Sequence, residues 1–336
     1  MKTASDPWPT GEWRRHLADV VRDLGELLDL LGLDAEYLEV GATSPAALRF
    51  PLRVPRGFVS RMGRGDPDDP LLRQVLPVGA EDDDVPGFSV NPVGELGLSR
   101  GDGLLSKYHG RALLVTTGAC AVHCRYCFRR HFPYDEGSSS GREGSTVIAA
   151  IADDPTIEEV ILSGGDPLML PDGVLSNLAT GIASSPHVRR LRIHTRMPIV
   201  LPERVDLALV EWLAACTVPV VVVVHANHPN EISPSVARAF RAIAGAGASV
   251  LNQSVLLRGV NDSAEVLIEL SKRLFDGGAL PYYLHLLDRV AGAAQFEVER
   301  AVALEIMGDL RAKLPGYLVP RLVREVEGAA SKVSVG

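Results

Sequence analysis

Residues 158–183 read EEVILSGGDPLMLPDGVLSNLATGIA, and this stretch contains one complete strand–loop–helix unit. Its first run, EEVILSGG, is short and apolar, which is typical of a strand buried on both faces. After a turn rich in Gly, Asp and Pro, residues 175–183 show helical spacing of their apolar side chains. A strand, a helix and a further strand in sequence form a right-handed crossover, so such units build parallel sheets.

The same unit recurs on both sides of this stretch. The other strand-like runs are ALLVTTG (112–118), RRLRIHTR (189–196), PVVVVVH (219–225), ASVLNQS (248–254) and YYLHLL (282–287). The helical candidates are residues 146–152, 175–183, 207–214, 234–246, 264–275 and 298–313. Six units are too few for a closed eight-stranded barrel. We therefore predict an α/β fold with a partial (β/α)6 TIM-like barrel.

The chain before this series has a different pattern. It holds one amphipathic stretch, LADVVRDLGELLDLLGL (17–33), among connections rich in Pro, Gly and Asp such as RGDPDDP (64–70). We expect three parts: an N-terminal helical extension (1–105), the barrel (106–315) and a C-terminal tail (316–336).

Composition narrows the class of protein. A chain of 336 residues with 46% hydrophobic residues can bury a sizeable core, and its net charge of −8 argues against a nucleic-acid partner. The longest apolar run, VPVVVVV (218–224), is too short to span a bilayer, and the first residues lack the apolar segment of a signal peptide. We expect a cytoplasmic protein with no membrane partner.

Polar residues gather where each predicted strand ends. Because the carboxyl ends of strands in a parallel barrel converge on one mouth, these residues should face a common cavity. The six groups are Cys120, Ser163–Asp166, His194–Arg196, His225–His228, Asn252–Ser254, and His285 with Asp288. Polar residues at strand ends can also mark only the ends, but that reading explains one or two groups better than six.

Three of the four cysteines stand in the first of these loops, at Cys120, Cys124 and Cys127. Such crowding is no disulfide framework and indicates metal. A zinc site needs four N or S ligands, and His123 or His131 could complete one, so zinc remains an alternative. A four-iron cubane is usually held by four thiolates. Three thiolates leave one iron open for a small molecule.

The C-x3-C-x2-C spacing directly after a first strand resembles the radical S-adenosylmethionine superfamily. The resemblance implies that the three cysteines bind a [4Fe-4S] cluster and that S-adenosylmethionine chelates the open iron. It also implies that Tyr126 contacts the adenine, and that the stretch Ser163, Gly164, Gly165 and Asp166 lies against the methionine end of the cosubstrate. A glycine pair taken alone would indicate only a tight turn.

Further segments narrow the resemblance. KYHGRALL (107–114), CRYCFRR (124–130), NHPNEI (227–232), LNQSVLLRGVND (251–262) and PYYLHLLD (281–288) are similar to those of the lysine 2,3-aminomutases. RVPRGF (53–58), RGDPDDPLLRQVL (64–76) and RRHFPY (129–134) resemble, more narrowly, the enzymes that supply (R)-β-lysine for elongation factor P.

These enzymes use pyridoxal 5'-phosphate (PLP), which needs a lysine. The chain has five: Lys2 near the terminus, Lys272 and Lys313 in amphipathic helices, and the two remaining candidates Lys107 and Lys332. The resemblance assigns Lys332 to the Schiff base with PLP, and it places the other cofactor contacts at Lys107, Tyr108, Arg111, Asn252, Gln253 and Ser254. A disordered basic tail is the alternative for Lys332.

The resemblance also suggests how lysine is recognised. It implies that Arg129 binds the substrate carboxylate and that Asp288 and Glu325 bind the ε-ammonium. Two features depart from the catabolic free-lysine enzymes: Ser263 replaces a cysteine, and the chain lacks their longer C-terminal region with zinc ligands. No zinc site between subunits is therefore expected. Cys216 lies outside every motif and is expected to be a structural thiol.

The implied activity is that of an isomerase that converts L-α-lysine to (R)-β-lysine. A flavodoxin- or ferredoxin-type donor would supply one electron, and a separate lysyl ligase would attach the product to elongation factor P. One alternative enzyme makes free β-lysine for a solute or secondary metabolite. The alternative outside enzymes is a zinc or iron–sulfur binding module, which has no reason to carry SGGD, NQS and Lys332 on one face.

Overall fold

The structure is a computed structural model of the whole chain, and it describes residues 6–34, 45–97, 103–134 and 144–336. Within these residues, nine strands form one sheet in the order of the sequence. They are β1 (Leu104–Tyr108), β2 (Arg111–Val115), β3 (Glu159–Ser163), β4 (Arg190–Thr195), β5 (Val220–Val224), β6 (Ser249–Val255), β7 (Leu280–His285), β8 (Arg321–Arg324) and β9 (Val333–Ser334). Strands β2 to β8 are parallel, and β1 and β9 add antiparallel edges.

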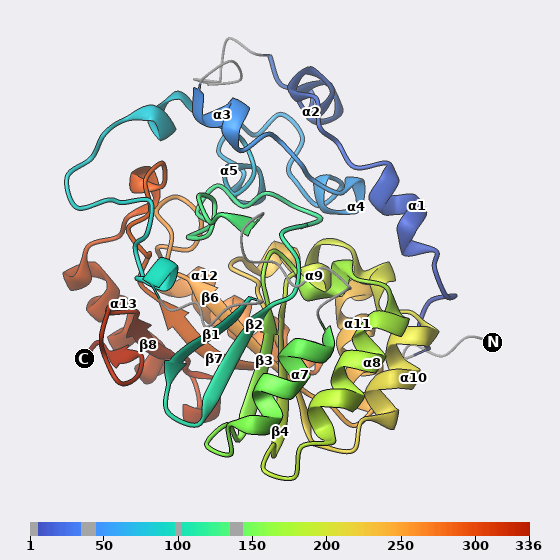
Figure 1. Cartoon of the computed structure of the whole chain (residues 1–336). Coiled ribbons are helices and arrows are strands. Elements are labelled where there is room, and N and C mark those ends of the chain that lie inside the picture. The colour runs from blue at the N-terminus through green and yellow to red at the C-terminus, as the bar shows by residue number, and fades with distance from the viewer. Residues whose placement is uncertain (1–5, 35–44, 98–102, 135–143) are drawn as a thin grey trace.

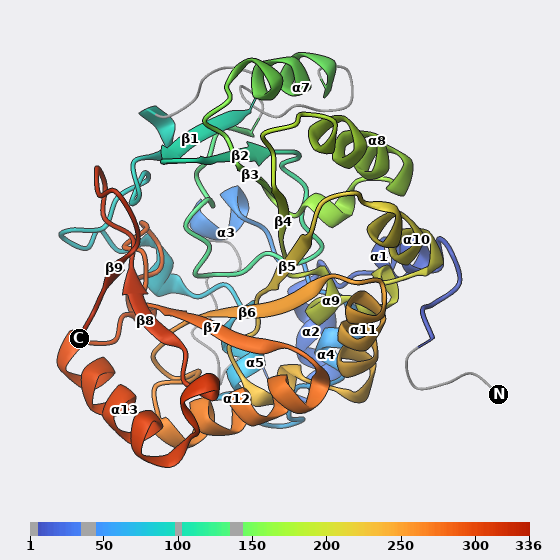
Figure 2. The ribbon, with the colours of Figure 1, turned by 90° about the horizontal axis from the view of Figure 1, so that it is seen from below.

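A helix follows each of the first six parallel strands and packs outside the curved sheet (Figure 2). These helices are α7 (Gly144–Asp153), α8 (Asp172–Ala183), α10 (Leu207–Ala215), α11 (Pro234–Gly245), α12 (Ala264–Gly277) and α13 (Arg300–Lys313). The short α9 (Met197–Val200) lies between β4 and α10. The predicted partial (β/α)6 barrel is confirmed, with each helix within four residues of its expected bounds.

The seventh parallel strand, β8, was not predicted. It is short, RLVR, with exposed arginines at both ends, so its two buried residues give no recognisable period. Leu322 and Val323 pair with β7, and Arg324 pairs with Val333 of β9. The expected C-terminal tail is therefore part of the sheet rather than an appendage to it.

Local sequence explains where the barrel helices begin. Asp206, Ser233 and Ser263 are the N-caps of α10, α11 and α12, and each side chain accepts a hydrogen bond from a backbone N–H of the first turn. Gly278 ends α12 with a φ of 102°, which favours glycine. Ser263, noted above as a replacement for cysteine, thus has a capping role in this chain.

The N-terminal part consists of short helices that lie over the barrel mouth (Figure 1): α1 (Trp13–Ala18), α2 (Leu24–Leu31), α3 (Pro45–Arg49), α4 (Arg56–Val59) and α5 (Pro70–Arg73). The amphipathic stretch 17–33 is not one helix, because Asp23 caps a new helix and Val21 pairs with Val54 in a β-bridge. Arg61 donates to the carbonyl oxygens of Ile199 and Glu231, at 2.7 and 2.6 Å, which joins this part to the mouth loops.

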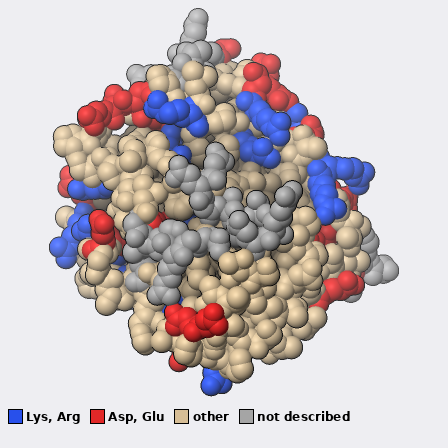
Figure 3. All heavy atoms as spheres, in the orientation of Figure 1, with Lys and Arg blue, Asp and Glu red and all other residues tan. Residues whose placement is uncertain are grey.

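In the described part of the chain, no helix combines the length and apolar character needed to cross a membrane. The face shown in Figure 3 carries Lys and Arg side chains interspersed with Asp and Glu around its rim.

Candidate active site

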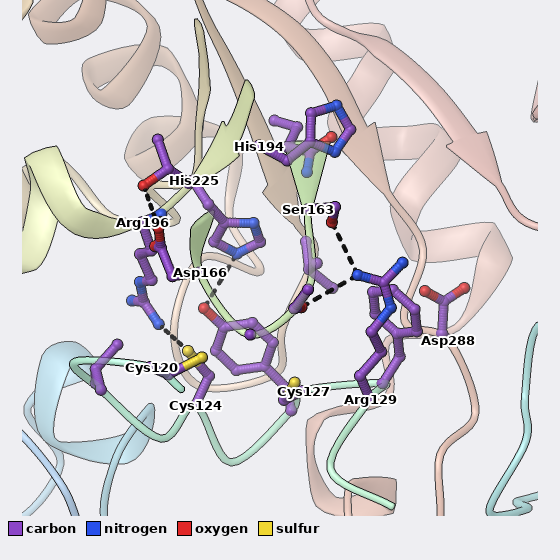
Figure 4. A pocket seen from close by; sticks show the side chains of 18 of the residues that line it. Cys120, Cys124, Cys127, Arg129, Ser163, Asp166, His194, Arg196, His225 and Asp288 are labelled. Atoms are coloured by element: carbon purple, nitrogen blue, oxygen red, sulfur yellow. Dashed lines mark hydrogen bonds between the residues drawn. The ribbon is translucent and has the colours of Figure 1, made fainter. Parts of the chain in front are cut away.

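One cavity of about 270 Å³ lies at the carboxyl ends of the parallel strands (Figure 4). The polar groups at the carboxyl ends of the six parallel strands β2 to β7 all contribute to its wall, and Glu325, after β8, brings a seventh contribution. The wall includes Cys120, Cys124, Cys127, Tyr126, Arg129, Ser163, Gly164, Gly165, Asp166, His194, Arg196, His225, Gln253, His285, Asp288, Glu325 and Lys332. The prediction of a common cavity is confirmed, and it brings the cysteines and Lys332 together.

A buried carboxylate of the N-terminal part holds the cysteine loop (residues 116–131) in place. Glu81 is fully buried and pairs with Arg125 and Arg130, which lie on either side of Cys127. The backbone N–H of Arg125 also donates to the carbonyl of Gln74 at 2.9 Å. Burial makes such pairs costly to break, because removing one partner leaves an unpaired charge. The N-terminal part therefore holds the loop that carries the thiols.

The two histidines of this loop have other contacts. His123 stacks on Phe50 at 4.6 Å between ring centroids, and its Nδ1 bonds the carbonyl of Pro51 at 2.8 Å. His131 bonds the carbonyl of Ala291 through Nε2 at 3.0 Å. Among the described residues, no group of three or more His, Cys, Asp and Glu is arranged around a single ion. Both imidazoles thus bond backbone carbonyl oxygens of the protein.

Cys120 and Cys127 need nearby positive charge to ionise. Burial raises the pKa of Cys127 to about 11 and that of Cys120 well above the usual value. Three thiols that form no disulfide and line one cavity suit a cluster that spreads its irons among them and supplies the cations. The residues present therefore fit a cubane cluster.

Gly164 and Gly165 are required by the protein backbone itself. A Cβ on Gly164, whose φ is +135°, would lie 2.4 Å from the carbonyl oxygen of Thr117, and a Cβ on Gly165 would lie 2.4 Å from that of Ala119. The two glycines let the loop after β3 pack directly on the cysteine loop. Asp166 then accepts from Thr195 Oγ1 and from the backbone N–H of Arg196, both at 2.7 Å.

Only one residue of Asn252–Ser254 lines the cavity, which corrects the expectation that all three do. These residues lie within β6 rather than after it, and side chains alternate along a strand. Gln253 lines the wall. Asn252 and Ser254 are buried on the other face and bond the backbone of Ala226, so they join β6 to the end of β5.

Tyr126 is buried in the cavity wall and belongs to a polar network. Its hydroxyl lies 3.1 Å from His225 Nε2 and 2.7 Å from Asn227 Nδ2, and its ring stacks on His225. This network fixes the ring at one edge of the cavity. An aromatic face held in this way can stack on a flat heterocycle.

Arg129 contacts the loop after β3 and forms hydrogen bonds with Glu95 through two of its nitrogens. Its Nε and Nη2 donate to Glu95, at 2.7 and 2.9 Å, and its Nη1 donates to Ser163 Oγ at 2.8 Å (Figure 4). Burial lowers the pKa of Arg129, but the Glu95 carboxylate outweighs it and raises the pKa above its usual value. Arg129 is thus a fixed cation in the cavity wall.

Lys332 reaches the cavity from the turn between β8 and β9. Its Nζ pairs with Glu325, which also accepts a hydrogen bond from the Tyr108 hydroxyl. Asp288 lines the same wall. Arg111 is the first residue of β2, at the end of the strand opposite to the cysteine loop. Its guanidinium lies over the Tyr108 ring, at 5.2 Å from the ring centroid. Lys107 lies in β1, and its side chain is outside the described residues.

Comparison with known proteins decides the family. Residues 114–270 match the family model of the Radical SAM superfamily. An L-lysine 2,3-aminomutase of Escherichia coli (strain K12) is 50% identical over 96% of this chain and 93% of its own. That of Haemophilus influenzae is 43% identical over 95% and 94%, and that of Clostridium subterminale is 34% identical over 96% and 77%. The chain belongs to the L-lysine 2,3-aminomutase family.

As a member of the L-lysine 2,3-aminomutase family, the protein is an isomerase. The family implies a [4Fe-4S] cluster, S-adenosylmethionine and PLP as cofactors. The family assignment also excludes the zinc-module alternative.

Sequence reasoning missed several residues that shape the site of this aminomutase-family chain. Glu95, Gln74 and Glu231 are buried polar side chains that come from the N-terminal part or from the loop after β5. No local pattern marks them, because each is recognised only by its distant partner. Arg196 was noted only as a strand-end residue, although HTR, a cation directly after a buried strand, was a usable signal.

Proposed function

We propose that this protein converts L-α-lysine to (R)-β-lysine, with PLP bound covalently at Lys332. One observation supports this proposal above all others: Lys332 and the three cysteines line the same cavity. A single substrate could therefore contact both cofactor systems. The other lysines with described side chains, Lys272 and Lys313, lie on α12 and α13 and not in the cavity wall.

Cys120, Cys124 and Cys127 would hold the cluster, and Tyr126, Gln253 and the loop 163–166 would hold S-adenosylmethionine beside it. When bound, these groups supply a carbon radical that removes a hydrogen from the substrate, and PLP carries the migrating nitrogen. Tyr108 and Arg111 lie together next to Glu325, on the side where we place PLP, and we place Lys107 in the same contact set.

The charges of the cavity wall fit the substrate. Arg129 is the fixed cation for the carboxylate, while Asp288 and Glu325 are the acids for the ε-ammonium. Glu325 now neutralises Lys332. Once Lys332 carries PLP, its ammonium no longer provides that counter-charge. The ε-ammonium of the substrate can then take its place.

We also propose the three parts expected from the sequence, with residues 1–105 over the mouth, 106–315 as the barrel, and 316–336 as the part that brings Lys332. The contacts of Arg61 and Glu81 with the barrel support the first assignment. The fold of residues 321–334 onto β7 supports the third.

For the physiological role, we propose that the β-lysine serves the modification of elongation factor P through a separate lysyl ligase. The segments around residues 53–76 and 129–134 support this choice over a supply of free β-lysine. A flavodoxin- or ferredoxin-type protein would supply the electron.

The test uses anaerobically reconstituted protein with S-adenosylmethionine, PLP, dithionite and L-lysine. We expect β-lysine and 5'-deoxyadenosine by mass spectrometry. Release of 5'-deoxyadenosine without β-lysine would overturn the lysine assignment while leaving the radical chemistry intact. The role in elongation factor P modification is tested in a strain deleted for the gene: loss of β-lysylated factor supports it, and unchanged modification overturns it.

A further inference from the structure

Arg196 donates a hydrogen bond to the sulfur of one cysteine of the triad. Its Nη1 lies 2.7 Å from Cys124 Sγ, and the side chain reaches this position from the loop after β4 (Figure 4). The residue is 7% exposed, so little water screens the contact.

The guanidinium is held in this direction by two further contacts. Its Nη2 donates to Gln74 Oε1 at 2.7 Å and to Glu231 Oε2 at 3.0 Å. The rings of Phe58 and Tyr126 lie on its flanks, at 5.5 and 5.6 Å from the guanidinium carbon. The backbone N–H of Arg196 is also fixed, because Asp166 accepts from it.

Glu231 is a rigid counter-charge rather than a mobile one. It is fully buried, and it accepts from the backbone N–H groups of Asn227 and His228, at 2.8 and 3.0 Å, as well as from Gln74 Nε2 at 3.1 Å. Burial raises the pKa of Glu231, but the Arg196 cation and these donors outweigh it and hold the pKa below its usual value. The carboxylate therefore stays charged.

We propose that Arg196 is a positioning residue that raises the reduction potential of the cluster through its hydrogen bond to Cys124, and that Glu231 partly offsets this effect. A one-electron reduction adds negative charge to the cluster. A nearby cation and a donor to a ligand sulfur stabilise the reduced form, whereas a nearby carboxylate destabilises it. Arg196 and Glu231 should thus shift the potential in opposite directions.

The experiment is an EPR-monitored redox titration of the anaerobically reconstituted protein without S-adenosylmethionine, PLP or lysine. It is therefore independent of the lysine assignment. Arg196→Met removes the charge and the donors but keeps the stem. We expect the equilibrium constant for one-electron reduction of its cluster to fall at least tenfold. This fall corresponds to a shift of the reduction potential by about 59 mV in the negative direction. Arg196→Lys keeps the charge and should shift less.

Glu231→Gln should shift the potential in the positive direction. Arg192→Met is the matched control, because Arg192 lies on β4, just before Arg196, and also pairs with a buried carboxylate, Glu159, but does not line the cavity. It should leave the potential unchanged.

A purely structural role would lower iron content or move all cavity variants in one direction. A wild-type potential in fully iron-loaded Arg196→Met overturns the proposal. If that variant binds fewer than four irons, the other two decide: unchanged potentials in both Arg196→Lys and Glu231→Gln overturn it equally.

Discussion

Glu95 binds Arg129 through both carboxylate oxygens, at 2.7 Å from Nε and 2.9 Å from Nη2, and both side chains are buried. The pair orients the guanidinium. Its Nη1 in turn donates to Ser163 Oγ and to the carbonyl oxygen of Gly164. Under the proposed function, the substrate carboxylate would meet a cation already fixed in place.

Glu95→Ala should reduce the free energy of unfolding by about 3–5 kcal/mol, because it leaves a buried guanidinium unpaired. Chemical denaturation of the metal-free protein measures this. The matched control is Glu158→Ala, which breaks an exposed pair with Arg190 at 3.6 Å and should cost about 1 kcal/mol or less. Equal losses in the two variants would contradict the importance given to this pair.

Replacing Cys120, Cys124 or Cys127 by Ala should abolish S-adenosylmethionine cleavage, because each thiolate would hold one iron. Wild-type protein should bind about four irons per chain after reconstitution. Cys216→Ala is the control, since Cys216 follows α10 outside the cavity wall, and it should retain iron and cleavage. Iron and zinc are measured by mass spectrometry. A colourless wild type with stoichiometric zinc would be incompatible with the assignment.

Borohydride reduction of the PLP-loaded protein should leave a phosphopyridoxyl label on the peptide that contains Lys332. Lys332→Ala should lose β-lysine formation but keep its iron, because the two cofactor sites use different residues. Lys313→Ala, on the exposed side of α13, should behave as wild type. A label on Lys107 would reverse the assignment of these two lysines.

Three imidazoles of the cavity should make the protein sensitive to acid. Burial lowers the pKa of His225 and of His285 to about 3, and it lowers that of His194 well below the ordinary 6.5. Each imidazole stays neutral in the folded protein, whereas the unfolded chain binds protons below about pH 6.5. The contribution of these histidines to the free energy of unfolding is therefore fully present above pH 6.5, and it is lost as the pH falls toward 3.

Below pH 6.5, the free energy of unfolding should fall by about 1.4 kcal/mol per pH unit for each of these histidines. Denaturant titrations of the metal-free protein between pH 4 and 7 measure it. His285→Phe should remove one such contribution, because the variant has no imidazole at this buried position. An unchanged slope in His285→Phe would show that His285 is not buried neutral.

Asp288→Asn should reduce β-lysine formation by roughly 3–5 kcal/mol of transition-state stabilisation, because the substrate ammonium loses one of the two acids of the cavity wall. Release of 5'-deoxyadenosine should continue slowly, since the cysteine side of the cavity is unchanged. Leucine, which lacks the ammonium, should be rejected for the same reason. Near-normal β-lysine formation in both Asp288→Asn and Glu325→Gln would mean that these acids do not bind the ammonium.

The sequence predicts the barrel well because its strands and helices alternate with strong apolar periods, from β2 to α13. It also predicts which loops meet, since parallel strands put their carboxyl ends together. It does not predict β8, whose two buried residues are too few to show a period. The helix break at residues 19–23 was also missed, because it depends on a cap at Asp23 and a distant partner, Val54.

For the site, the cysteine spacing and the resemblance name many residues that line one cavity, among them the three cysteines, Arg129 and Lys332. Tyr108, Arg111, Asn252 and Ser254, which were named with them, do not line it. The buried partners of nearby arginines were not accessible in this way. Glu81, Glu95 and Glu231 act on arginines between 34 and 49 positions away, and local patterns carry no signal for such distances. Asn252 and Ser254 show the converse error, because residues adjacent in a strand point to opposite faces.

The late position of β8 has a consequence for synthesis. Ribosomes release the chain from its N-terminus, so the cysteines and strands β2 to β7 emerge before residues 321–334. Until then the edge of β7 lacks its partner, and an unpaired edge is open to association with other chains. The final 16 residues thus complete the sheet at the moment they deliver Lys332. A nascent chain arrested before these residues would expose β7 as an unpaired edge strand that is prone to aggregation.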